Sequence, residues 1–107
     1  MLILSKTIKL IQDGWCQFSY ALTLDDKPVS FISKDAKKFC IDGALRKIFR
    51  ENNCTITEEF AFLDKIDMEI RKITVYFTSV VFNDNPKTTK DDVLDFLRNI
   101  NILHPDW

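Results

Sequence analysis

Four side chains of this chain could act as a nucleophile, a general base or a metal ligand: Cys16, Cys40, Cys54 and His104. A catalytic cysteine needs a thiolate and a nearby base, and the one histidine stands next to Pro105, far along the sequence from all three cysteines. Structural zinc sites use closely spaced pairs of cysteine and histidine ligands, and these four residues form no such pair. We therefore expect no metal, no cofactor and cysteines that serve as small buried apolar side chains.

The acidic residues also lack the arrangement of a general acid and base. They include the adjacent pairs Asp25–Asp26, Glu58–Glu59 and Asp91–Asp92, and neighbours on a helix point about 100° apart. Each pair has a local explanation as a turn or as the first turn of a helix. Because Gly14 and Gly43 are the only glycines, the chain has no glycine-rich loop for phosphate. These absences predict that the protein is not an enzyme.

Asn83 and Asp84, shortly before Pro86, are the polar residues most suited to a binding site. Beside a proline, these residue types usually hydrogen-bond the backbone of a turn, and that is the interpretation we favour from the sequence. The alternative is a polar site in which they face Trp15 and Gln17. We therefore take Trp15, Gln17, Asn83 and Asp84 as the candidate binding residues. A small enzyme with a polar pocket around Asn83 and Asp84 is the least favoured alternative.

The composition is that of one folded domain covering residues 1–107. Hydrophobic residues make up 46% of the chain, including nine phenylalanines and two tryptophans, which predicts an aromatic-rich core. Fifteen basic and sixteen acidic residues nearly cancel, so no overall field attracts nucleic acid or an anionic membrane. The longest apolar-rich stretch, residues 73–82, is about half as long as a membrane span.

The start of the chain and the cysteines bear on its location. Residues 1–4 are apolar but are followed by Ser5 and Lys6, which does not resemble a signal peptide. An odd number of widely spaced cysteines is untypical of a disulfide framework. We therefore expect a reduced, cytoplasmic protein with no part in the membrane.

Charge is unevenly distributed along the middle of the chain. Residues 34–51 are rich in lysine and arginine, whereas residues 58–69 are rich in acidic residues. Such runs are usually solvated helix faces, and we interpret these two as helices that attract one another across their polar flanks. A bipolar surface for a partner is the alternative. Phosphate contacts from the cationic run, with bases stacked on Trp15 or Tyr20, make nucleic-acid binding a less favoured hypothesis.

The spacing of apolar residues predicts the first elements. A short first helix is capped by Ser5 and can end at Gly14 in a left-handed conformation. Apolar and polar residues then alternate over residues 16–24, which is typical of a strand with one buried face. Residues 25–28 have the composition of a turn, and residues 29–31 can return as the second strand. We therefore expect a small β-hairpin after the first helix.

The strongest helical pattern covers residues 35–49, with Ser33 as its cap. Gly43 lies inside this pattern, although glycine in a helix costs about 1 kcal/mol relative to alanine. With Cys40 and Ala44 it forms a row of small residues at positions i, i+3 and i+4. We expect this notch to receive another backbone segment or an aromatic ring at close range.

Two further helices follow. Thr55 and the glutamate three residues later have the spacing of a capping box, and the apolar pattern after them predicts one helix that continues through residues 73–82. A strand is the alternative for this last part, because it is rich in β-branched and aromatic residues. Residues 83–86 form a turn that ends it, and Thr88 or Thr89 caps the last helix. The predicted fold is mainly α: a compact bundle of about four helices with a small β-hairpin between helices 1 and 2.

Three short blocks occur in a fixed order: Trp-x-Gln from Trp15, Cys-x-x-Gly-Ala-Leu from Cys40, and an aromatic residue followed by Asn-Asp from Phe82. In these blocks the chain resembles a small family of bacterial and phage proteins catalogued as a domain of unknown function. Members of that family usually carry tryptophan where this chain has Phe39 and Phe82. The resemblance implies a compact, mainly helical fold in which Trp15, the notch and the Asn-Asp turn converge. It implies no reaction.

These observations lead us to predict a non-catalytic protein-interaction module. The chain lacks catalytic residue patterns, and it has more apolar side chains than a small core easily hides, which leaves patches for a protein partner. Because the resembling family includes phage proteins, an inhibitor or regulator of a host protein is one form of this prediction. A homodimer is its simplest form. A nucleic-acid-binding regulator is the main alternative.

Overall fold

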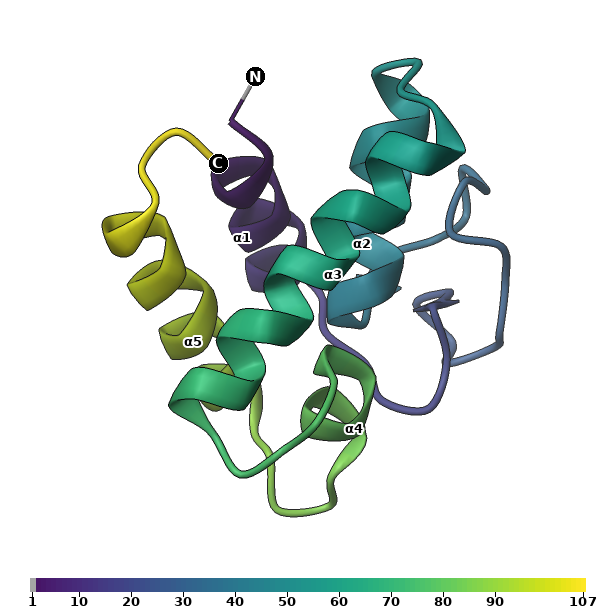
Figure 1. The fold of residues 1–107 in the computed structure, drawn as a ribbon. Coiled ribbons are helices and arrows are strands. Elements are labelled where there is room, and N and C mark those ends of the chain that lie inside the picture. The colour runs from purple at the N-terminus through teal and green to yellow at the C-terminus, as the bar shows by residue number, and fades with distance from the viewer. Residues whose placement is uncertain (1) are drawn as a thin grey trace.

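The computed structural model describes residues 2–107, and helices form most of them (Figure 1). A two-stranded antiparallel sheet lies between the first two helices in the sequence. The prediction of a mainly α fold with a small sheet in this place is therefore confirmed. The elements of the described residues are α1 (Ile3–Asp13), β1 (Ala21–Leu22), β2 (Lys38–Phe39), α2 (Ile41–Glu51), α3 (Ile56–Ile73), α4 (Ser79–Asp84) and α5 (Lys90–Leu103).

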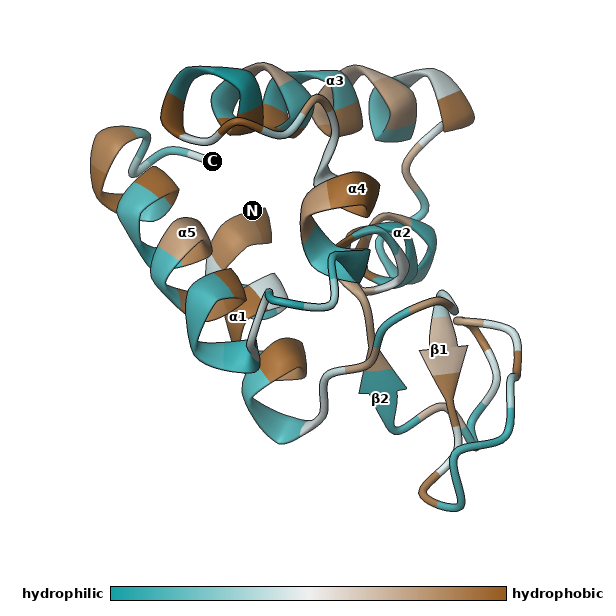
Figure 2. Ribbon diagram, turned by 90° about the horizontal axis from the view of Figure 1, so that it is seen from below, coloured by the Kyte–Doolittle hydropathy of each residue, from teal (hydrophilic) through white to brown (hydrophobic). Residues whose placement is uncertain are grey.

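The core is formed where the apolar stripes of the helices meet. α1 contacts α2 and α5, and α2 also contacts α3 and α4. Figure 2 shows the hydrophobic residues of α3 recurring along the side that faces the other helices. None of the described helices is both long enough and apolar enough to span a membrane. The largest apolar side chains with almost no exposed surface are Leu4, Ile11, Ile41, Leu45, Ile66, Ile70, Leu97 and Ile100.

α1 begins at Ile3 without a side-chain cap, so the prediction that Ser5 caps it is wrong. The N–H groups of Ile3 and Leu4 instead donate to the backbone carbonyl oxygen of Trp107, at 2.7 and 3.3 Å. The Trp107 ring packs edge-to-face against Phe62, and Figure 1 shows both ends of the chain on the same side. The segment after α5 therefore supplies the acceptor that the free N–H groups of a helix start require.

The predicted capping box at Thr55 is confirmed, and of the two caps predicted for the last helix, Thr88 and Thr89, the structure uses Thr89. The Thr55 hydroxyl accepts a hydrogen bond from the Glu58 N–H at 3.1 Å, and the Glu58 carboxylate accepts one from the Thr55 N–H at 2.9 Å. This backbone hydrogen bond from Thr55 holds the pKa of Glu58 below its usual value. Thr89 and Asp92 form the same pair at the start of α5. Local sequence therefore decides where α3 and α5 begin.

Gly14 follows α1 in an extended conformation, with φ −178°, so the predicted left-handed residue is not present there. Its missing side chain matters for another reason. A Cβ atom at Gly14 would collide with the backbone carbonyl of Lys37, and the Gly14 carbonyl oxygen accepts the N–H of Phe39 at 3.0 Å. The glycine allows the segment before α2 to pass directly against the end of α1.

α2 begins at Ile41, so a helix over residues 35–49 capped by Ser33 is wrong. Its cap is Cys40, whose sulfur accepts the N–H of Gly43 at 3.3 Å. Gly43 therefore lies in the first turn of the helix and not in its middle. The helical period of the sequence extends before Cys40, but the backbone there is used in strand pairing.

β2 pairs with β1, and Ala21 lies opposite Phe39. The prediction that residues 29–31 form the second strand is wrong, although Pro28 makes a single antiparallel bridge to Leu22. The longer connection arises because the Gly14 carbonyl and the strand residues both bind the backbone just before α2. Contacts distant in the sequence thus override the local turn signal.

The predicted alternation over residues 16–24 also fails. Cys16 and Ala21 are buried, whereas Phe18, Tyr20 and Leu24 of the expected apolar face are exposed. The cause is a break in the extended backbone, because Phe18 has a φ of 67°. A left-handed residue turns the chain and ends the alternation of side chains between two faces.

Residues 73–82 form neither one continuous helix nor a strand. α3 ends at Ile73, and α4 begins at Ser79 with Thr78 as its cap. The Ser79 N–H also donates to the Asp67 carboxylate at 2.8 Å, which folds α4 back against α3. This break produces a fifth helix, and the predicted turn at Asn83–Asp84 is instead the end of α4.

The cationic and acidic runs do form attracting flanks of α2 and α3. Glu59 is completely buried, and its carboxylate lies 2.9 Å from Nε of Arg50 and 3.4 Å from Nη1 of Arg46. Lys47 pairs with Glu51 within α2. Much of the positive charge of the cationic run is therefore neutralised by carboxylates inside the molecule.

The notch at Gly43 is filled by backbone, as predicted. A Cβ atom there would collide with the carbonyl oxygen of Tyr20, and the same oxygen accepts the N–H of Cys40 at 3.3 Å. The glycine thus lets the segment before β1 lie directly on the start of α2.

Gly43→Ala should lower the free energy of unfolding by about 1–3 kcal/mol, because the added methyl group would push the Tyr20 carbonyl away from α2. At an ordinary helix position the same change stabilises by about 1 kcal/mol. The sign of the change in stability therefore shows whether the Tyr20 carbonyl lies against Gly43. Ala61→Gly, at an exposed position of α3, is the matched control and should cost about 1 kcal/mol. Urea denaturation measures both, and a stabilised Gly43→Ala protein would contradict the close approach.

Candidate functional site

The four candidate residues lie together where the segment after α1 meets the end of α4. The indole N–H of Trp15 donates to Oδ1 of Asn83 at 2.8 Å. The side-chain amide of Gln17 donates to the backbone carbonyl oxygens of Asn83 and Asn85, at 3.0 and 2.8 Å. Asp84 accepts from the Asn83 amide at 2.9 Å. The structure thus brings Trp15, Gln17, Asn83 and Asp84 into one hydrogen-bonded network.

Asn83 is the centre of this network and is completely buried. Its Oδ1 accepts the N–H of Ile41, at 3.2 Å, in addition to the Trp15 N–H. Its Nδ2 donates to the carbonyl oxygen of Cys16, at 3.1 Å, and to Asp84. Both acceptor positions and both donor positions of the amide are therefore used. Asn83 joins three segments of the chain and has no polar atom left for a ligand.

Asp84 connects this network to a strained residue. Its Oδ1 accepts the N–H of Phe18 at 2.9 Å, and Phe18 has the positive φ described above. A residue with a bulky side chain rarely adopts this conformation. The Asp84 hydrogen bond helps to hold it, and the Phe18 ring is left 71% exposed.

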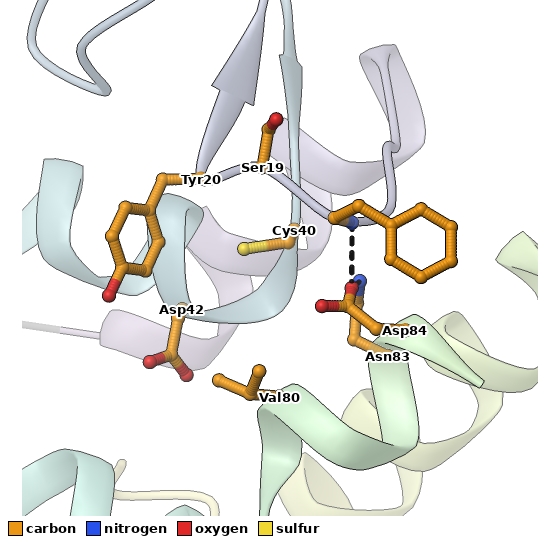
Figure 3. Close-up of a pocket in the computed structure, with 8 residues that line it drawn as sticks. Ser19, Tyr20, Cys40, Asp42, Val80, Asn83 and Asp84 are labelled. Carbon is orange, nitrogen blue, oxygen red and sulfur yellow. Dashed lines mark hydrogen bonds between the residues drawn. The ribbon is translucent and has the colours of Figure 1, made fainter. Parts of the chain in front are cut away.

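A pocket of about 250 Å³ lies beside the network. Figure 3 shows side chains from the segment before β1, from the start of α2 and from α4 around one space. The rim is apolar, and the deeper walls carry two carboxylates and a thiol. Its lining includes Phe18, Tyr20, Cys40, Asp42, Val80 and Asp84.

Asp42 lies in the first turn of α2 and is buried. Its Oδ1 accepts the hydroxyl of Ser79 at 2.8 Å, and its Oδ2 lies 3.9 Å from Nη2 of Arg46. Burial raises the pKa of Asp42, while the Ser79 hydrogen bond and Arg46 act in the opposite direction and Asp67 and Asp84 raise it further. The pocket therefore holds a carboxylate where its charged form is disfavoured.

The two thiols near the pocket are not activated. Burial raises the pKa of Cys40 to about 12 and that of Cys16 to about 11, so both are protonated at neutral pH. A nucleophilic cysteine requires the opposite shift. Cys16 and Cys40 are buried as predicted, whereas Cys54 is only half-buried.

Metal-binding groups are absent from the part of the chain that the structure describes. Within residues 2–107, no three histidine, cysteine, aspartate or glutamate side chains are placed to hold a metal ion. His104 is engaged elsewhere, because its Nε2 lies 3.2 Å from Oε1 of Glu69 and its ring stacks on Trp107. It does not line the pocket beside Cys40.

A family model described as a family of unknown function, DUF6197, matches residues 2–100. The chain belongs to this family. The match includes all of the network and the whole lining of the pocket. Neither a curated protein nor a solved structure matches the chain. What this DUF6197 protein does therefore has to be argued from its own geometry.

Sequence reasoning missed Phe18, Ser19, Asp42 and Val80 of the pocket lining, and it named Tyr20 only as a residue on which bases could stack. Phe18 and Tyr20 were assigned to the buried face of a strand, and nothing local signals the turn at Phe18. Asp42 is not recognisable as a candidate residue because the predicted helix begins too early and places Asp42 in its middle. Recognising Cys40 as a cap would have placed Asp42 in the first turn, where a carboxylate is favoured.

Asn83→Ala should lower the Tm of this DUF6197 protein by roughly 10 °C or more. The change leaves the Trp15 and Ile41 N–H groups without their acceptor, and each buried unsatisfied group costs about 1–3 kcal/mol, which corresponds to ~4–8 °C per kcal/mol at this size. Asp84→Asn keeps an oxygen for the Phe18 N–H and should change the Tm far less. Thermal denaturation followed by circular dichroism measures both, and an unchanged Tm in Asn83→Ala would contradict the structural role.

The Tm of Asp42→Asn should be higher than that of the wild type at neutral pH, and this difference should disappear in acid. Because the pKa of Asp42 is raised above 3.8 by folding, the folded protein binds the proton more tightly than the unfolded chain, and stability falls as the pH rises through the folded pKa. Below the unfolded value the wild-type side chain is neutral in both states and resembles asparagine. Asp25→Asn, in an exposed turn, is the control and should change the Tm little. A Tm difference that is the same at pH 7 and pH 3.5 would contradict the prediction.

Proposed function

We propose that the chain is a non-catalytic protein-interaction module whose partner binds over the pocket. The observation that carries this proposal is the apolar rim, where Phe18, Tyr20 and Val80 are 71%, 48% and 41% exposed. Val81, next to Val80 on α4, is 51% exposed. Apolar side chains gathered around a concave surface are typical of a protein-binding site.

The conformation of Phe18 supports this proposal. Its backbone is in the left-handed region, which costs an ordinary residue about 1–2 kcal/mol, and the side chain is mostly exposed, so burial offsets little of this cost. Glycine or asparagine would fit this position with less strain. A strained residue that presents an aromatic ring to solvent is better explained by a binding role than by stability.

The pocket offers little support for the two alternative functions. Its thiol, that of Cys40, is protonated at neutral pH, and no histidine lines it, so it lacks a nucleophile and a base of the usual kind. Its carboxylates would repel phosphate groups, and Arg46 and Arg50 of the cationic run are paired with Glu59. These features favour a protein partner over a substrate or a nucleic acid.

The size of the surface favours a regulatory form of this function. One small pocket with an apolar rim is suited to one contact with a larger protein, as in an inhibitor or regulator. A second copy of the chain is the other protein partner to consider, and it would appear as a change of mass in solution.

Phe18→Asn should abolish partner binding without loss of stability, because asparagine tolerates the left-handed backbone and removes the exposed ring. Ile102→Asn, which removes a 78% exposed apolar side chain from α5, is the matched control and should bind normally. The measurement is affinity capture of each tagged protein from its native cells with quantitative mass spectrometry, and light scattering tests self-association. Equal recovery of every specifically captured protein by wild type and Phe18→Asn would contradict the proposal.

A further inference from the structure

The volume of the pocket limits what can enter it. At about 250 Å³ it lies below the range of roughly 300–1,000 Å³ that is usual for sites that enclose a drug-sized ligand or cofactor. At its rim are the exposed side chains of Phe18, Tyr20 and Val80. These dimensions suit one long side chain presented by a partner.

Negative charge from two carboxylates gives the pocket its chemical preference. Both hydrogen bonds that Asp84 accepts fall on Oδ1, and no lysine, arginine or histidine among residues 2–107 forms an ion pair with it. Asp42 adds a second carboxylate, and Figure 3 shows the two residues on opposite sides of the space above Val80. A cation placed between them would be attracted by both.

Arg46, which pairs with Asp42, does not neutralise both carboxylates. Arg46 is 3.9 Å from Asp42 but also 3.4 Å from the buried carboxylate of Glu59. Its guanidinium lies over the rings of Tyr20 and Phe60. Arg46 is therefore shared with a second carboxylate on α3, and it is not part of the pocket lining.

We propose that the pocket receives an arginine side chain of the protein partner, between Asp42 and Asp84 and against the ring of Phe18. This inference rests on the proposed function. A guanidinium group is planar, donates to carboxylates through several N–H groups and stacks on aromatic rings. Its three-carbon stem is apolar and suits the rim residues. Lysine offers a more strongly hydrated point charge and no flat face for the ring, and so fits this surface less well.

The test uses a probe of known chemistry: the peptide acetyl-Leu-Arg-Leu-amide, titrated into the ¹⁵N-labelled protein and followed by NMR. The amides of Phe18, Tyr20, Asp42, Val80 and Asp84 should shift. The same peptide with citrulline, which has nearly the shape of arginine without its charge, should bind roughly tenfold more weakly, because a hydrogen bond to a charged group is worth about 1.5 kcal/mol or more. Asp84→Asn should reduce the difference between the two peptides, because only Asp42 then remains to attract the cation, and added salt should reduce it as well.

Equal shifts with arginine and citrulline, shifts confined to another face, or an arginine preference that Asp84→Asn leaves unchanged would overturn the inference. Asp84→Asn keeps the acceptor for the Phe18 N–H, so a folded variant is expected, and its amide spectrum shows whether the rim is intact. A negative result with the peptides can be distinguished from failure of the proposed function. A partner that is captured by wild type and lost with Phe18→Asn would leave the protein-interaction role in place even if the arginine preference is absent.

Discussion

The side-chain amide of Asn83 is the interaction on which the rest of this structure depends. It accepts N–H groups from Trp15 and Ile41 and donates to Cys16 and Asp84. One planar group thereby connects the segment after α1, the start of α2 and the end of α4. Burial makes each of these hydrogen bonds important for stability. A buried N–H or C=O group without a partner destabilises the fold by more than one hydrogen bond stabilises it. The end of α4 is thereby fixed to the segment after α1 and to the start of α2.

Two glycines make this arrangement sterically accessible. Gly14 and Gly43 each lie against a backbone carbonyl, of Lys37 and Tyr20 respectively, where a methyl group would collide. Together they let the chain between α1 and α2 return along its own backbone before α2 begins. The pocket forms at this crossing, since its walls come from the segment before β1, the start of α2 and α4. The hydrogen-bonded network therefore lies beneath the pocket and holds in place the segments that carry the exposed rim residues.

Features decided by neighbouring residues could be predicted from the sequence, and features decided by distant ones could not. The capping boxes at Thr55 and Thr89 and the apolar stripe of α5 depend on spacing within a few residues. Gly43 carried a correct signal of close approach, because its cost in a helix requires a compensating contact. The start of α2 was misplaced since backbone hydrogen bonds to residues 14–22 outweigh helical periodicity there. Trp15, Gln17, Asn83 and Asp84 were found through their residue types, whereas the rim depends on the φ of Phe18, which no local pattern reveals.

Two unfavourable features of different physical origin meet at the same pocket. Asp42 keeps a carboxylate where burial opposes its charge, and Phe18 keeps a strained backbone to expose a ring. Neither is required by the hydrogen bonds of Asn83, whose four positions are filled without Asp42 or the Phe18 side chain. A sequence shaped for stability alone would have replaced both residues, because neutral and left-handed-tolerant alternatives exist at each. Departures from local optimality that coincide in space are typical of functional surfaces. The coincidence supports the proposal that the rim residues and Asp42 serve binding, whereas the amide network beneath them holds the fold.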